Sequence, residues 1–196
     1  MTQSTDAASL MDDADIDAWW EEGADITGRL VAAIAVASRA VPAFNARYDA
    51  DRQTFEPLPT VDLGIVIETE AGVEVPVLTD VGHKSIAEIR RELNALRMVI
   101  ETRSPSPSVT LVNFGRGPCR YATLPIVPPQ VAIIAAGQML LQPVRHGSRT
   151  VNRRFLPLTL TYDVRASTLL GATRFLGALK ADLANRDLPL ARGWHE

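Results

Sequence analysis

The stretch PLTLTYDVRASTLLGATRFLGALKADL, residues 157–183, decides how the fold of this chain is interpreted. Its first part is rich in β-branched and aromatic residues and ends at Tyr162-Asp163, which is typical of a strand. Its second part carries apolar residues at spacings of three and four, which predicts a helix packed on a core. The apolar positions of that helix are Leu169, Ala172, Leu176, Leu179 and Leu183. A strand that leads into a helix in this way favours an α/β domain.

The segments that precede this stretch predict a mixed sheet. The strand 153–164 returns from a polar hairpin tip at 145–150, and VAIIAAGQMLL (131–141) is typical of one buried strand. SVTLVNFG (108–115) predicts another strand. Residues 61–80 hold two β-rich runs around a Glu-Ala-Gly turn, which indicates a hairpin. Strands and helices do not alternate regularly, so a doubly wound parallel sheet is not expected.

Capping signals predict two further helices. Asp25 is suited to cap a helix that runs to about residue 41, where Pro42 ends it. Ser85 with Glu88 three residues later forms a capping box. The helix that follows Ser85 carries an apolar face made of Ile86, Ile89, Leu93, Leu96 and Ile100.

The N-terminal segment differs in composition from the rest of the chain. Residues 1–25 contain eight acidic residues and no lysine or arginine, and residues 1–10 are expected to form a loose tail. Residues 15–26, DIDAWWEEGADI, predict either a short edge strand with Trp19 and Trp20 docked on the same molecule or a peptide that binds a partner. Docking on the same molecule is favoured. We therefore divide the chain into an acidic tail or docking segment at 1–25 and a main domain at 26–196.

Composition excludes several classes of protein. The chain has 196 residues, 46% hydrophobic and 22% charged, which is typical of one globular domain. A single cysteine, Cys119, gives no disulfide framework and suits a reducing compartment. The net charge is −3, and residues 26–196 carry a net charge of only +5, which is too mildly basic to predict a nucleic-acid partner. The apolar runs are too short to cross a membrane. The acidic start is unlike a secretion signal, so a cytoplasmic protein is expected.

Five stretches, in order, resemble one protein family. They are residues 29–51, 62–89, 110–117, 124–137 and 157–183. They are similar to the Pro-x-x-Asn turn, the G-L-x-x-P-V hairpin, the T-I-S-N-L-G strand, the N-P-P-Q segment and the D-H-R motif of dihydrolipoamide acyltransferase catalytic domains. Those domains belong to 2-oxo acid dehydrogenase complexes and share the chloramphenicol acetyltransferase fold. The resemblance covers about residues 26–187 and implies an α/β domain with a mixed β-sheet, flanking helices and assembly into a trimer.

The resemblance also implies a catalytic site, and this chain departs from it. In the family a histidine acts as general base, a serine of another subunit stabilises the oxyanion, and an aspartate or asparagine lies four residues after the histidine. The corresponding positions here are Val164, Val112 and Thr168, and the glycine that follows in the family is Leu169. Valine neither accepts a proton nor donates a hydrogen bond. The resemblance therefore implies a degenerate site, and whether the chain is an enzyme stays open.

Other polar residues are candidates to line the former acyl channel. They are Asn113, Cys119, Asp163, Arg165 and Thr168. For Asp163 and Arg165 a structural ion pair is favoured, and for Cys119 a nucleophile beside Arg116 and Arg120 is the less favoured alternative.

The histidines offer no obvious replacement for the missing base. His83 is expected in a surface loop, His146 at a hairpin tip and His195 at the end of the chain. Each is interpreted as a solvated loop residue rather than as a displaced catalytic base. No metal site is expected.

Two functions remain open from the sequence. The first is a non-catalytic structural or binding protein on a trimeric framework, as a homotrimer or mixed with full-length acyltransferase subunits. The alternative is a repurposed stand-alone enzyme of a biosynthetic pathway, with altered acyl chemistry or cyclisation in the channel between subunits. No cofactor is expected in the first case, because no lipoyl module is present in these residues. Coenzyme A or a carrier-bound acyl group belongs only to the alternative.

Overall fold

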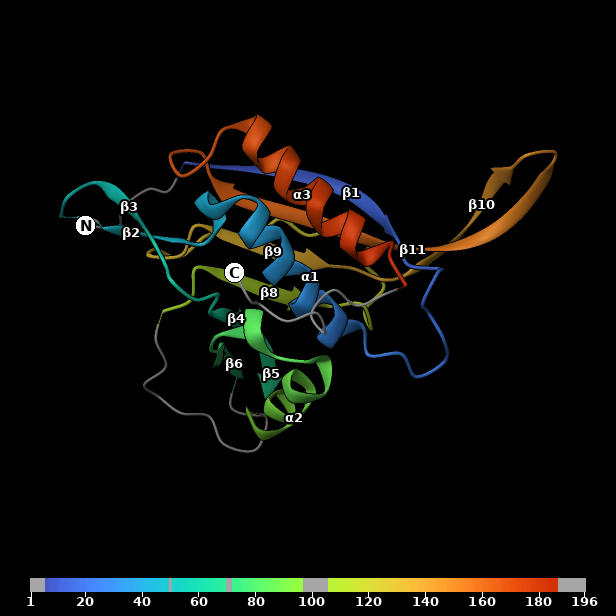
Figure 1. The fold of residues 1–196 in the computed structure, drawn as a ribbon, viewed down its shortest axis with the longest axis horizontal. Coiled ribbons are helices and arrows are strands. Elements are labelled where there is room, and N and C mark those ends of the chain that lie inside the picture. Colours follow the sequence, from blue (N-terminus) through green and yellow to red (C-terminus); the bar gives the residue numbers. More distant parts are fainter. Residues whose placement is uncertain (1–5, 50, 70–71, 97–105, 187–196) are drawn as a thin grey trace.

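A mixed sheet with helices on one face forms the body of the molecule (Figure 1). The computed structural model describes residues 6–49, 51–69, 72–96 and 106–186. The strand order is β1-β11-β9-β8-β4-β7, and β10 pairs with β11 outside this order. The strands are β1 (Ala7–Asp15), β4 (Leu63–Ile65), β7 (Val77–Leu78), β8 (Val109–Asn113), β9 (Ala132–Ala136), β10 (Leu140–His146) and β11 (Arg149–Asp163). β8 runs parallel to β4 and β9, and the other pairs are antiparallel, which confirms the expected mixed sheet.

The three α-helices of the described residues begin where the sequence predicts. α1 (Ile26–Ala40) is capped by Asp25, whose side chain accepts a hydrogen bond from the Gly28 N–H, and it ends before Pro42. α3 (Leu169–Leu183) is capped by Thr168. α1 and α3 pack side by side on the sheet, and their apolar faces form much of the core. Leu169 is an exception to the predicted helix face, because it lies in the first turn of α3 and is 60% exposed.

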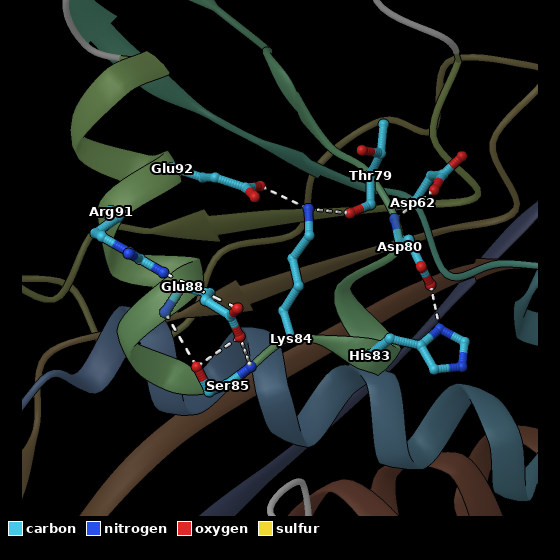
Figure 2. A network of polar contacts seen from close by, with 9 residues as sticks. All are labelled: Asp62, Thr79, Asp80, His83, Lys84, Ser85, Glu88, Arg91 and Glu92. Carbon is cyan, nitrogen blue, oxygen red and sulfur yellow. Dashed lines mark hydrogen bonds and ion pairs between the residues drawn. The ribbon is translucent and has the colours of Figure 1, made fainter. Parts of the chain in front are cut away.

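The start of α2 (Ile86–Leu96) is fixed by a network of polar contacts (Figure 2). The Ser85 N–H and hydroxyl both donate to Glu88, at 2.8 and 2.7 Å, which confirms the capping box. These hydrogen bonds are the main reason that the pKa of Glu88 is lowered. Lys84 Nζ donates hydrogen bonds to the Thr79 carbonyl oxygen, at 2.6 Å, and to the Glu92 carboxylate, at 2.7 Å. Of the predicted apolar face, Ile89 and Leu93 are buried, whereas Ile100 lies outside the described residues.

The expected loose tail at residues 1–10 is wrong for residues 7–10. They begin β1, which pairs along its whole length with β11 and places Ala7 opposite Asp163. The edge strand expected at 15–26 lies earlier in the chain, because β1 spans Ala7–Asp15 and a turn follows it. The residues of β1 have little intrinsic strand propensity, and the pairing with β11 decides their conformation.

Both N-terminal tryptophans dock on the same molecule, as favoured from the sequence. The Trp19 indole N–H donates to the Leu183 carbonyl, and its ring lies 5.6 Å from the Arg29 guanidinium. The guanidinium of Arg154 lies 3.9 Å from the centre of the Trp20 ring. The two rings therefore join the N-terminal segment to α1, α3 and β11.

The hairpin predicted at 61–80 is present but divided. β4 and β7 belong to the main sheet, while β5 (Ile67–Thr69) and β6 (Gly72–Glu74) form a separate two-stranded sheet. Glu70 and Ala71 of the predicted turn lie outside the described residues. A second small hairpin, β2 (Ala46–Asp49) with β3 (Thr54–Pro57), has no counterpart among the predicted elements.

The strand expected at 131–141 is broken at Gly137. β9 ends at Ala136, and the chain then turns into β10, which forms with β11 an arm that projects from the body (Figure 1). At the break, the Gln138 N–H donates to the Cys119 carbonyl. A Cβ atom on Gly137 would lie 1.8 Å from the Arg120 carbonyl oxygen, so only glycine fits beside this crossing loop. The hairpin tip at Gly147 is where the sequence predicts it.

Candidate functional site

The two valines at the positions where the resemblance implies catalytic residues lie at opposite ends of the sheet. Val112 is near the end of β8, level with Ala135 of β9 and hence with Thr159 of β11. Val164 follows the last residue of β11, five residues beyond Thr159. At a rise of about 3.3 Å per residue, this separates them by roughly 17 Å along the strand direction. The opposite directions of β8 and β11 are visible in Figure 1, so one copy of the chain does not bring these positions together.

Polar contacts hold the chain around Val164, directly after the end of β11. Asp163 is 2% exposed and accepts hydrogen bonds from the Arg165 guanidinium, at 2.9 Å from Nε and 2.6 Å from Nη2. These hydrogen bonds are the main reason that the pKa of Arg165 is raised. The Arg165 guanidinium also lies 4.4 Å from the centre of the Tyr48 ring. The structural ion pair favoured from the sequence is therefore present.

Three large apolar residues within and after this ion pair are exposed. Val164 is 44% exposed, Leu169 60% and Leu170 61%. Thr168, between them, accepts a hydrogen bond from the Gly171 N–H at 3.2 Å and so caps α3. Its hydroxyl therefore has a structural partner. We call Val164, Leu169 and Leu170 the apolar corner.

A groove lies at the other end, beside the last residues of β8. It consists of two adjoining cavities of about 490 Å³ each, which share Thr27, Arg90, Asn113 and Arg116. We call them together the β8-end groove. Its apolar lining is Ile26, Ile65, Val66, Ile67, Leu93, Leu111, Met139 and Leu156.

Of the predicted channel residues, only Asn113 lines this groove. Its amide donates to the Thr27 hydroxyl at 3.0 Å, and its carbonyl oxygen accepts from the Gly115 N–H at 3.1 Å. Cys119 is exposed, with Sγ 3.1 Å from the Tyr121 carbonyl oxygen, and neither cavity includes it in its lining. Asp163, Arg165 and Thr168 lie at the opposite end of the sheet. The structure thus separates the five candidates rather than gathering them.

An ion pair that the sequence did not predict closes one side of the groove. Arg90 of α2 donates to both carboxylate oxygens of Asp25, and Asp25 also accepts from the Gly28 N–H at 2.8 Å. Burial acts to raise the pKa of Asp25, but the hydrogen bonds from Arg90 and Gly28 outweigh it, and the pKa is lowered. The sequence indicated Asp25 only as a helix cap.

This lowered pKa predicts a pH-dependent contribution to stability. We expect Asp25→Asn to cost about 1 kcal/mol near neutral pH, because the cap is retained and the charge that pairs with Arg90 is lost. Because the pKa of Asp25 is lower in the folded chain than in the unfolded one, its carboxylate stabilises the fold at pH values above 3.8. This stabilisation is lost as the pH falls below 3.8 and through the folded-state pKa. Urea unfolding of both proteins between pH 7 and pH 3 measures the difference. Glu22→Gln, at an exposed position, is the control, and a constant difference across this range would contradict the assignment.

The described histidines lie neither beside Val164 nor in the β8-end groove. His83 is in the predicted surface loop, with Nδ1 2.6 Å from the Asp80 carboxylate (Figure 2). His146 is exposed at the hairpin tip, and His195 lies outside the described residues. Neither described histidine is therefore near position 164, where the resemblance implies a general base.

Within residues 6–49, 51–69, 72–96 and 106–186, no three His, Cys, Asp or Glu side chains are grouped as metal ligands. No helix in the same part of the chain has the length and apolar character needed to cross a membrane.

Comparison with known proteins gives consistent matches. The model of the 2-oxoacid dehydrogenases acyltransferase (catalytic domain) family matches residues 17–191. The dihydrolipoyllysine-residue acetyltransferase component of the pyruvate dehydrogenase complex of Haemophilus influenzae is 29% identical over 167 residues. That match covers 79% of this chain and 29% of the relative, so the chain spans less than a third of the relative's length.

Solved structures agree with the sequence comparison. A structure of the Azotobacter vinelandii dihydrolipoamide acetyltransferase matches with a TM-score of 0.81 and 26% identity, over 92% of this chain and 82% of that one. It was solved to investigate a serine, a histidine and an asparagine in the catalytic mechanism, and their sequence intervals equal those of Val112, Val164 and Thr168. A chloramphenicol acetyltransferase matches with a TM-score of 0.65 and 14% identity, over 91% of this chain and 89% of that one. The expected fold is confirmed.

Proposed function

This chain belongs to the 2-oxo acid dehydrogenase acyltransferase catalytic-domain family, and we propose that it is a non-catalytic member that acts as a structural or binding protein on a trimeric framework. One observation carries the proposal. Val112, Val164 and Thr168 occur at the intervals of the catalytic serine, histidine and asparagine investigated in the Azotobacter enzyme. Neither valine can transfer a proton or donate a hydrogen bond to an oxyanion.

The separation of Val112 and Val164 supports an assembly. Residues that act in one catalytic mechanism have to meet, and in this fold their positions lie at opposite ends of the sheet. Two copies that place unlike ends together satisfy this requirement, and a head-to-tail contact of this kind gives a ring where the rotation between copies closes. We propose a ring of three, formed by this chain alone or mixed with full-length acyltransferase subunits.

The structure offers little support for a resident cofactor. A bound thioester reacts by way of a base and an oxyanion donor, and the corresponding positions hold valines. The polar residues predicted to line a channel are divided between two ends of the sheet, and Thr168 and Asp163 already have partners. We therefore propose that the chain holds neither a lipoyl group nor coenzyme A.

The test is native mass spectrometry of the tagged chain purified gently from its own host. We expect homotrimers or mixed oligomers with a full-length acyltransferase, without a bound small molecule. Mixed oligomers would support the structural function most directly. A homotrimer that retains a small bound mass would favour the alternative, an enzyme of altered acyl chemistry. A monomer would contradict the proposed framework.

A further inference from the structure

The inference concerns the number of catalytic sites that one copy of this chain affects in a mixed ring. We propose, resting on the non-catalytic function and the mixed oligomers proposed above, that this chain is an attenuating subunit. One copy placed among active acyltransferase subunits silences the two sites that it borders, rather than one. The partner is an active subunit of the same fold, which keeps the serine, histidine and asparagine investigated in the Azotobacter enzyme.

The distance between the two ends of the sheet assigns each end to a different site. Val112 lies level with Thr159 of β11, and Val164 lies five residues further along that strand. This separation is about 17 Å along the strands, whereas catalytic groups act within a hydrogen-bond reach of about 3 Å. One copy therefore contributes the serine position to one site and the histidine position to another. In a closed ring, every copy borders two sites.

This chain lacks the reacting groups at both ends. Val112 stands at the serine position, and Val164 and Thr168 stand at the histidine and asparagine positions. Neither valine transfers a proton or donates a hydrogen bond to an oxyanion. A replacement at one end alone would leave the other site of the same copy in working order. Because both ends are changed, both sites beside the copy lose a necessary group.

The side chains that hold the backbone around Val164 are retained. Asp163 and Arg165 stand where the D-H-R motif has its aspartate and arginine. Asp163 accepts hydrogen bonds from the Arg165 backbone N–H, at 2.9 Å, and from its guanidinium, at 2.6 Å. The Arg165 guanidinium also lies 4.4 Å from the centre of the Tyr48 ring. The turn that carries Val164 and leads to the rest of the apolar corner is therefore held in place, although the histidine is absent.

The backbone frame around Val112 is retained as well. Asn113 and Gly115 stand where the T-I-S-N-L-G strand has its asparagine and glycine. The Asn113 side chain accepts from the Gly115 N–H, at 3.1 Å, and donates to the Thr27 hydroxyl, at 3.0 Å. Both ends have thus lost the groups that react and kept the groups that shape the backbone. This selective loss favours a subunit that takes a place in the ring and contributes no chemistry to it.

Mixed rings of known composition test the number of silenced sites. This chain and a full-length active subunit of its own host are produced together with different tags, and rings that carry both tags are isolated in two affinity steps. Native mass spectrometry gives their composition. For one copy of this chain with two active subunits, we expect about one third of the acetyl transfer of an all-active ring, because only the site between the two active subunits works. Loss of one site alone would leave about two thirds.

Repair of one end at a time identifies the two silenced sites. In the same mixed ring, Val112→Ser restores the serine position alone, and Val164→His with Thr168→Asn restores the other end alone. We expect each repair to raise acetyl transfer from about one third to about two thirds. Val73→Ser is the matched control, because Val73 is a valine on β6, 68% exposed and at neither end, and we expect it to leave the rate unchanged. Failure of either repair to raise the rate would contradict the assignment of one site to each end.

The outcomes separate the attenuation from the proposed function. Mixed rings that keep about two thirds of the acetyl transfer would overturn the silencing of two sites and leave the non-catalytic function intact. Homotrimers of this chain without any mixed rings would also overturn the attenuation and leave the non-catalytic function intact. Acetyl transfer by this chain alone, or a monomeric state, would overturn the proposed function and the attenuation with it.

Discussion

The purified oligomer is expected to transfer acetyl groups between coenzyme A and dihydrolipoamide at a rate indistinguishable from that of buffer. Loss of a positioned general base lowers a rate by roughly 10²–10⁴-fold. Loss of an oxyanion donor lowers it by roughly 10²–10³-fold, although the two losses need not multiply. With Val164 and Val112 at these positions, we expect a deficit of at least about 10²-fold relative to an active family member, and of about 10⁴-fold or more where the two losses multiply. A spectrophotometric assay of thioester formation measures it.

The assay needs a positive control and a restored variant. An active dihydrolipoamide acetyltransferase assayed in parallel sets the scale. The variant Val112→Ser, Val164→His and Thr168→Asn restores the three side chains implied by the resemblance. A measurable rate for this variant would attribute the missing activity to these three positions. A measurable rate for the wild-type chain would refute the non-catalytic function.

A second large effect is expected from Arg29→Ala, which we predict to lower the free energy of unfolding by about 3–5 kcal/mol. Arg29 is 3% exposed, and its Nη1 lies 2.6 Å from the Asp182 carboxylate. Its Nη2 donates to the carbonyl oxygens of Asp182 and Asn185. The pair joins α1 to α3, and its removal on one side leaves a buried charge without a partner. Urea unfolding measures the change.

Two variants show whether this loss comes from the unpaired charge. Arg91→Ala removes an exposed arginine that lies 3.9 Å from Glu88, and we expect a change below about 1 kcal/mol. Replacing both partners, by Arg29→Met with Asp182→Leu, should cost clearly less than Arg29→Ala, because no charge stays buried alone. Equal losses for the single and the double variant would indicate that packing against Trp19, rather than charge pairing, dominates.

The helices and the inner strands could be predicted because their patterns are local. Asp25, Ser85 with Glu88, and the apolar spacing after Thr168 each identify a helix within one or two turns. β1 could not be predicted, because Ala7–Asp15 is acidic and becomes a strand only beside β11. The break at Gly137 depends on the Arg120 carbonyl of a crossing loop, and no pattern within residues 131–141 indicates it.

The candidate site could be predicted only in part. The family resemblance placed Val112, Val164 and Thr168, and residue spacing alone would not have done so. The Asp163–Arg165 ion pair joins residues two apart, and it was correctly favoured as structural. The β8-end groove could not be predicted, because Asp25, Arg90 and Asn113 come from three distant segments. Their proximity is a property of the tertiary fold.

The pairing of β1 with β11 has a consequence for biosynthesis. The register joins Ala7 to Asp163, so the sheet stays incomplete until residue 163 has been made. At synthesis rates of about 5–20 residues per second, the first strand waits on the order of ten to thirty seconds for its partner. During that interval a strand edge could pair with other nascent chains. Asp12, Asp13 and Asp15 place like charges along this strand, and repulsion between these charges disfavours its pairing with another copy before β11 is available.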